Sequence, residues 1–236
     1  MNKKIKILII VIVACVLAYG IFYFTDVHHA EKTATDLLNG TDNVSVQKIS
    51  NGLWLDGPGN GTSLIFYPGA KNEYTAYLPL FVQLAENGVD CYLVEMPLNF
   101  AFFGQDSAEP IIEAGNYSHY IMSGHSLGGV SASSYAVHSN KTDAVVLLAA
   151  YPTEKIDKPV LSIYGSEDGI LNRESYNKAL PLISNLTECV IQGGNHAQFA
   201  YYGHQEGDNP AKISHDDQQN QTVEIILEFI NNVTMS

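Results

Sequence analysis

Cysteine and basic residues are both scarce in this sequence. Only three cysteines occur in 236 residues, Cys15, Cys91 and Cys189, so no disulfide framework is predicted. Cys91 and Cys189 lie inside strand-like runs and are expected to be ordinary core thiols. Twelve Lys and Arg stand against 25 Asp and Glu, giving a formal net charge of −13. This acidic balance argues against nucleic acid as a partner.

Metal-ligand motifs are missing as well. His196, His204 and His215 lie near several aspartates, but no H-E-x-x-H or other short-spaced ligand pair occurs among them. An acidic, solvated loop is the simpler interpretation of this segment. We therefore predict no metal and no cofactor.

One long hydrophobic run is present at residues 5–24, and Lys3, Lys4 and Lys6 lie at its start. About 20 residues at about 1.5 Å each match the roughly 30 Å hydrocarbon core of a bilayer. Residues 1–24 are thus predicted to be a single-pass membrane anchor, and residues 25–43 a juxtamembrane segment. The preceding lysines place the remaining domain outside the cytoplasm. A cleaved signal peptide, or lipidation at Cys15, are the alternatives.

Residues 44–236 are predicted to form one α/β domain. Its strands are expected at 44–49, 52–55, 63–67, 90–95, 119–123, 144–149, 160–164 and 188–191, and its helices at 74–87, 108–114, 127–137, 173–182 and 216–232. Strands separated by segments of helix length predict a mostly parallel sheet with helices on both faces.

The strongest chemical motif is Gly-His-Ser-Leu-Gly-Gly at residues 124–129. It lies between a predicted strand and a predicted helix, which is the context of a nucleophile elbow. Small residues on both sides let the backbone turn sharply at Ser126, and the N-terminus of the following helix favours developing negative charge. An ordinary tight turn is the alternative.

A serine nucleophile needs a base, and the base needs a carboxylate that orients it. Asp168 follows the predicted strand 160–164, and His196 follows the strand 188–191. The chain order Ser126, Asp168, His196 is the one expected for a nucleophile elbow of this kind. Taken singly, Asp168 could be a helix cap and His196 could have no role.

Backbone N–H groups are expected to stabilise the oxyanion. Gly69 follows the strand 63–67 and lets the chain aim the Ala70 N–H at the site, and the second donor is the Leu127 N–H. Only residues 151–159 separate two later strands, which leaves no room for a cap domain. The loops 97–105 and 199–207 should therefore wall the pocket, with Phe100, Phe102, Phe103 and Phe199 as candidate substrate-binding residues. Packing of these rings against the sheet is the alternative.

From Ser63 to the C-terminus the sequence resembles the α/β-hydrolase superfamily, specifically its compact "fold-5" branch, which is similar in size to dienelactone hydrolases. The resemblance rests on the segments FYPGA, VEMPLNFAFF, GHSLGG, AAYP, SIYGSEDGI and GGNHAQFAYYGHQEGD. It implies a nucleophile at Ser126, an acid at Asp168 and a base at His196. Dienelactone hydrolases carry a cysteine nucleophile, so the serine here argues against that activity.

These observations predict a membrane-anchored serine hydrolase that cleaves an ester or similar acyl bond in a small molecule. The same three residues could instead serve a peptidase, a thioesterase or a carbon–carbon hydrolase. A non-catalytic binding protein on a hydrolase scaffold is the alternative outside the enzymes. A complete set of three groups in order disfavours it, since binding alone does not need them.

Overall fold

The computed structural model describes residues 2–59 and 61–235, and its centre is a single eight-stranded sheet. The strand order is β1-β2-β4-β3-β5-β6-β7-β8, with β2 antiparallel to both β1 and β4 and every other neighbouring pair parallel. The strands are β1 Ser45–Ile49, β2 Gly52–Asp56, β3 Thr62–Tyr67, β4 Val89–Val94, β5 His119–His125, β6 Ala144–Leu148, β7 Ile156–Gly165 and β8 Ile183–Ile191.

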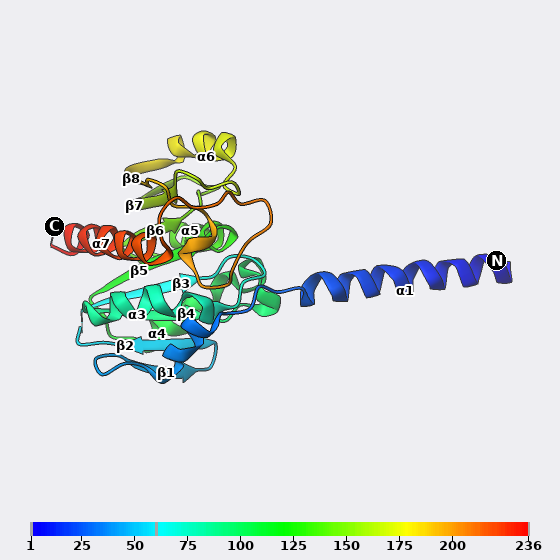
Figure 1. The fold of residues 1–236 in the computed structure, drawn as a ribbon, viewed down its shortest axis with the longest axis horizontal. Helices are drawn as coiled ribbons and strands as arrows, with labels where there is room; N and C mark the ends of the chain where they lie inside the picture. The colour runs from blue at the N-terminus through cyan, green and yellow to red at the C-terminus, as the bar shows by residue number, and fades with distance from the viewer. Residues whose placement is uncertain (1, 60, 236) are drawn as a thin grey trace.

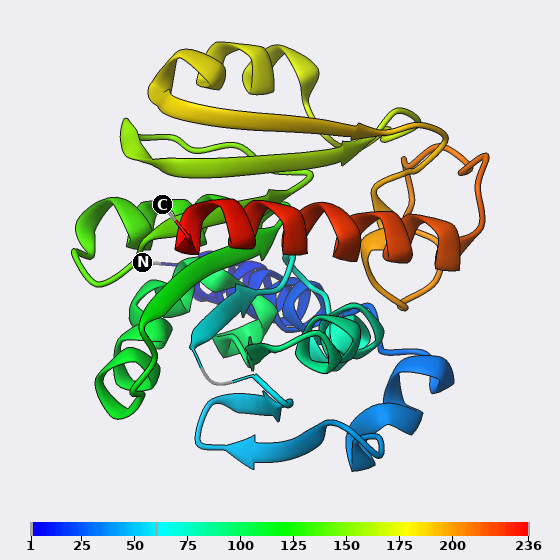
Figure 2. The same cartoon turned by 90° about the vertical axis from the view of Figure 1, so that its left-hand side faces the viewer.

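Helices cover both faces of this sheet (Figures 1 and 2). Side chains alternate along β3, so that Leu64 and Phe66 join one core cluster and Ile65 and Tyr67 join the other. The helices α3 (Leu78–Glu86) and α7 (His215–Thr234) pack in the first cluster, and α4 (Glu109–Ala114) and α5 (Leu127–His138) in the second. The predicted α/β architecture is confirmed, and the carboxyl ends of the parallel strands meet at one edge.

Several elements differ from the predicted bounds. The predicted helix 74–87 begins as a 3₁₀ turn at Tyr74–Tyr77, and α3 starts only at Leu78, because Pro79 lacks the N–H of a helix interior and lies in the first turn. The last two strands are longer than predicted. Much of β8 is exposed or half-buried at the edge of the sheet, so its sequence has fewer apolar residues than a central strand.

The N-terminal region contains α1 (Lys3–Thr25), which projects away from the sheet as a single helix (Figure 1). The juxtamembrane residues do not extend it. Instead the chain forms the short helix α2 (Lys32–Thr35) and a 3₁₀ turn at Asp36–Asn39. Among the described residues, no helix is both long enough and apolar enough to cross a membrane. The predicted transmembrane helix is therefore not supported by the structure.

Candidate active site

Ser126 lies in the sharp turn between β5 and α5. Its backbone angles are φ 53° and ψ −126°, a conformation that a residue with a side chain rarely adopts. The turn is held by a hydrogen bond in which the Ser126 N–H donates to the Leu148 carbonyl oxygen at 2.9 Å. A Cβ atom at Gly124 would lie 2.5 Å from the Gly128 carbonyl group, so only glycine fits there. This geometry is the strained elbow that the sequence predicts.

His196 and Asp168 form a hydrogen-bonded pair. The Nδ1 atom of His196 lies 2.9 Å from Oδ2 of Asp168, and both side chains are almost completely buried. The other carboxylate oxygen, Oδ1, accepts hydrogen bonds from the backbone N–H groups of Ile170 and Leu171. Three of the four acceptor positions of the carboxylate are thereby used, and the bond from Nδ1 orients the imidazole ring.

The protonation state of Asp168 follows from these contacts. Burial by itself raises the pKa of the carboxyl group, but the hydrogen bond and charge of His196, together with the two backbone N–H groups, more than offset it and hold the pKa below its usual value. The carboxylate is therefore ionised at neutral pH. It favours the tautomer of His196 that carries a proton on Nδ1, leaving Nε2 as a base.

The neighbouring acid, Glu167, points elsewhere. Its carboxylate lies 2.9 Å from the Lys212 Nζ atom and also accepts a hydrogen bond from the Ser166 hydroxyl group. Lys212 lowers the pKa of Glu167. Of the two acids that follow β7, it is thus Asp168 that contacts His196.

A cavity of about 330 Å³ brings the predicted groups together. Ser126 and His196 line it, and so do the proposed oxyanion donors Ala70 and Leu127. The remaining lining residues are mostly apolar and come from the first turn of α5 and from segments that follow the strands: Val130, Ala149, Ala150, Tyr151, Ile170, Leu171, Asn172 and Gln205. Such a lining suits an acyl group beside the polar reacting atoms.

The loop that carries Ala70 is fixed by a buried network beneath the cavity. The Tyr77 hydroxyl group accepts hydrogen bonds from the Gly69 N–H and the Asn72 side chain, each at 3.1 Å, and lies 2.8 Å from Nδ1 of His125. With both acceptor positions used, the hydroxyl group donates its proton to Nδ1. This hydrogen bond makes His125 the neutral tautomer with its proton on Nε2.

His125 is completely buried and precedes Ser126 in the elbow. Burial lowers the pKa of this imidazole well below its usual value, and the nearby His196 lowers it further. The ring lies 4.4 Å from that of His196, measured between centroids, so a positive charge on either ring would disfavour one on the other.

The four phenylalanines predicted to bind substrate do not line this cavity. Phe199 is fully buried in the core beside His125, and Phe100 stacks on Tyr23 of α1. The exposed fractions of Phe102 and Phe103 are 71% and 52%. For Phe199 the alternative of packing against the sheet is the one that the structure shows.

The lining residues that the sequence analysis missed follow a positional rule instead. Tyr151 comes shortly after β6, and Ile170, Leu171 and Asn172 come after β7. Residues that come shortly after a parallel strand are candidates for the lining, because the carboxyl ends of parallel strands meet at the site. This rule would have identified all four residues. Gln205 belongs to the loop 199–207, which was predicted to form part of the wall.

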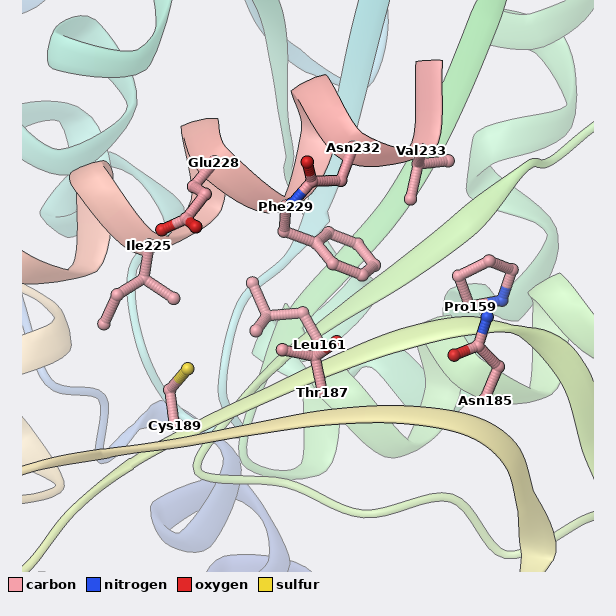
Figure 3. Close-up of a pocket in the computed structure, with 10 residues that line it drawn as sticks. All are labelled: Pro159, Leu161, Asn185, Thr187, Cys189, Ile225, Glu228, Phe229, Asn232 and Val233. Atoms are coloured by element: carbon pink, nitrogen blue, oxygen red, sulfur yellow. The ribbon is translucent and has the colours of Figure 1, made fainter. Parts of the chain in front are cut away.

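A larger hollow of about 450 Å³ lies elsewhere, between α7 and the strands β7 and β8 (Figure 3). Side chains such as Phe229, Leu161 and Cys189 point into it, together with Glu228 and Asn232 from α7. It contains none of the predicted catalytic groups. The smaller cavity is the one that holds the serine, the histidine and the candidate oxyanion donors together.

The family is decided by a match over most of this domain. A family model described as "Alpha/beta hydrolase family" matches residues 63–220. The chain belongs to the alpha/beta hydrolase family. The matched range of this alpha/beta hydrolase includes Ser126, Asp168 and His196 as well as the loop with Ala70.

Solved structures share the fold. A bacterial membrane phospholipase A superposes with a TM-score of 0.63 at 11% identity, covering 98% of this chain and 99% of that one. Carboxyl esterase 2 from Tuber melanosporum gives a TM-score of 0.60 at 11% identity, covering 88% of this chain and 91% of that one. Est1E from Butyrivibrio proteoclasticus gives 0.55 at 15% identity, with coverages of 80% and 100%. Comparison with curated protein sequences finds no match.

Proposed function

We propose that this alpha/beta hydrolase is a serine esterase that acts through a covalent acyl-enzyme. The hydrogen bond between His196 and the buried, ionised Asp168, at the wall of the cavity that also holds Ser126, is the observation that carries the proposal. Similarity to esterases and to a phospholipase supports an ester substrate.

In the proposed reaction the Ser126 hydroxyl group attacks the acyl carbonyl carbon, and Nε2 of His196 takes the hydroxyl proton. The Ala70 and Leu127 N–H groups stabilise the oxyanion of the tetrahedral intermediate. His196 then returns the proton to the leaving alcohol, and a water molecule releases the acyl group by the same steps in reverse order. The largely apolar lining supports a hydrophobic acyl group as the part of the substrate held in the cavity.

Replacing the nucleophile tests this function. The full-length Ser126→Ala variant should hydrolyse a short-chain p-nitrophenyl ester about 10⁴ to 10⁶ times more slowly than the wild-type enzyme, with an unchanged melting temperature. Retained turnover would show that another group attacks the ester. An amide, a thioester and a 1,3-diketone assayed in parallel would separate the peptidase, thioesterase and carbon–carbon hydrolase alternatives.

Membrane attachment through residues 1–24, with the catalytic domain outside the cytoplasm, is the second part of the proposal. It rests on the lysine-flanked apolar run and on the exposure of apolar side chains along α1, such as Ile10 at 66% and Val16 at 64%. Large apolar side chains on the outside of a helix favour an apolar surrounding over water.

A further inference from the structure

Four large apolar side chains are exposed near the catalytic cavity. We call them the apolar rim: Leu98, Phe102, Phe103 and Leu127, with exposed fractions of 57%, 71%, 52% and 57%. The rings of Phe102 and Phe103 lie 5.7 Å apart between centroids. Apolar patches of this kind on a soluble surface mark contacts with a protein, a ligand or a membrane.

The rim belongs to an ordered part of the chain. Ala101 and Ala108 are buried beneath it, and the Tyr67 hydroxyl group both donates to the Gln105 carbonyl oxygen and accepts from the Ala108 N–H. Leu98 has a φ of 54°, which costs free energy for a residue with a side chain. The fold thus accepts local strain in a turn that presents Leu98 to the outside.

The rim borders the mouth of the cavity. Leu127 belongs to both, and the Lys71 N–H donates to the Asn99 carbonyl oxygen at 2.8 Å, which ties the rim loop to the residue that follows Ala70. A protein partner or a second copy of this chain seated on the rim would obstruct substrate entry. A lipid surface would cover the same side chains and supply an ester at the mouth.

The N-terminal helix leaves the domain on this side as well. Tyr23 near the end of α1 stacks on Phe100 of the rim loop, with ring centroids 6.3 Å apart. In Figure 1, α1 projects outward on the side of the domain where the loop between β8 and α7 lies. Exposed apolar side chains of α1 therefore lie on the same side of the molecule as the rim. A single apolar environment can therefore accommodate both the exposed side chains of α1 and the apolar rim.

Given the esterase function proposed above, we propose that the apolar rim docks on the surface of a lipid bilayer and that the site takes its ester from that bilayer. Aromatic side chains favour the interface between headgroups and acyl chains. The part of the chain after Phe24 has nine basic and 25 acidic residues, a formal charge of −16, so apolar insertion into a zwitterionic surface fits better than attraction to anionic headgroups.

Docking can be measured directly by fluorescence. Trp54 is the single tryptophan, so a Trp54→Phe background carrying Phe102→Trp reports on the rim alone. The full-length protein is reconstituted in phosphatidylcholine vesicles with or without brominated acyl chains. We expect bromine to quench the rim emission by about half or more. The matched control is Met235→Trp in the same background, 83% exposed after α7 at the opposite end of the molecule, which should show little quenching.

The functional consequence is a selective loss of activity. Phe102→Ser should lower hydrolysis of p-nitrophenyl palmitate embedded in phosphatidylcholine vesicles about tenfold or more, whereas hydrolysis of dissolved p-nitrophenyl acetate should change less than twofold. Met235→Ser should leave both rates unchanged. Leu98→Ser combined with Phe102→Ser should enlarge the selective loss.

Three results would overturn the proposal. They are equal quenching at residues 102 and 235, equal loss on both esters, and a wild-type enzyme that cleaves the acetate but not the embedded palmitate. A rim occupied by a second copy would give the first of these together with a dimer by light scattering. If the wild-type enzyme cleaves neither ester while the rim is still quenched, it is the esterase function that fails, not the docking.

Discussion

At the residue scale, the two adjacent acids after β7 have separate roles. Oδ2 of Asp168 contacts Nδ1 of His196, while Glu167 pairs with Lys212 at the surface. Asp168→Asn keeps an oxygen for the Ile170 and Leu171 N–H groups but removes the charge that stabilises the imidazolium. We expect kcat for a p-nitrophenyl ester to fall about 10³- to 10⁴-fold in Asp168→Asn.

Glu167→Gln is the matched control, because the same change of acid to amide is made one position earlier. Its kcat should fall less than about tenfold. If Asp168 only caps the loop that follows it, Asp168→Asn would instead cost about 1 kcal/mol in the free energy of unfolding and keep its turnover. Steady-state kinetics and thermal melting of both variants separate these outcomes.

His125 provides a residue-scale prediction about pH. Its pKa is well below 6.5 in the folded protein because the ring is buried, whereas in the unfolded chain it returns to about 6.5. Below about pH 6.5 the unfolded state therefore binds a proton that the folded state does not. The neutral, buried His125 therefore contributes to stability above this pH. As the pH falls below it, the free energy of unfolding decreases by up to about 1.4 kcal/mol per pH unit.

The variant His125→Gln should lose less stability than the wild-type protein between pH 7 and pH 5, by about 1 to 2 kcal/mol. Chemical denaturation at the two pH values measures the difference. The half-buried His215, whose pKa burial also lowers, contributes equally to both proteins and cancels. Parallel curves for wild type and variant would show that His125 does not titrate during unfolding.

At the scale of elements, the start of α5 packs closely against the end of β3. A Cβ atom on Gly128 would lie 2.2 Å from the Pro68 carbonyl oxygen and 2.3 Å from that of Tyr67. Both contacts are with backbone atoms. The substitution Gly128→Ala must therefore displace either α5 or the start of the loop that carries Ala70. We expect a loss of about 1–3 kcal/mol in the free energy of unfolding and at least tenfold in kcat.

Gly61→Ala is the control for the methyl group itself, because a Cβ atom there meets no described heavy atom within 4 Å. Its stability should change by less than about 0.5 kcal/mol and its kcat should not change. A stable, fully active Gly128→Ala enzyme would contradict the close packing of α5 against the end of β3.

The sequence predicted those helices, strands and turns that depend on the pattern of neighbouring residues. Alternating buried strands and helices predicted the parallel sheet, and small residues around Ser126 predicted the elbow. The bounds of β8 were missed, since an edge strand needs few apolar residues. The apolar part of the cavity lining was missed for a different reason. Whether a phenylalanine such as Phe102 points inward depends on how its loop packs, which composition does not encode.

At the scale of the whole molecule, the open proposal concerns the N-terminal segment. If residues 1–24 remain as an anchor, the intact protein should stay in the membrane fraction after alkaline carbonate extraction, and its mature N-terminus should lie at or next to Met1. Protease added outside intact cells should remove the catalytic domain. Recovery in the soluble fraction, or a mature chain that begins at lipidated Cys15 or near Gly20, would contradict the anchor.

The central claim, that Ser126 is the nucleophile of a competent hydrolase, is tested most directly by covalent labelling. The full-length protein is treated with a fluorophosphonate, and the modified residue is mapped by peptide mass spectrometry. We predict stoichiometric labelling of Ser126 in the wild-type protein, none in Ser126→Ala, and slower labelling in Asp168→Asn because the base is no longer held and charged correctly. Labelling of a different serine, or no labelling of the folded wild-type protein, would contradict the account.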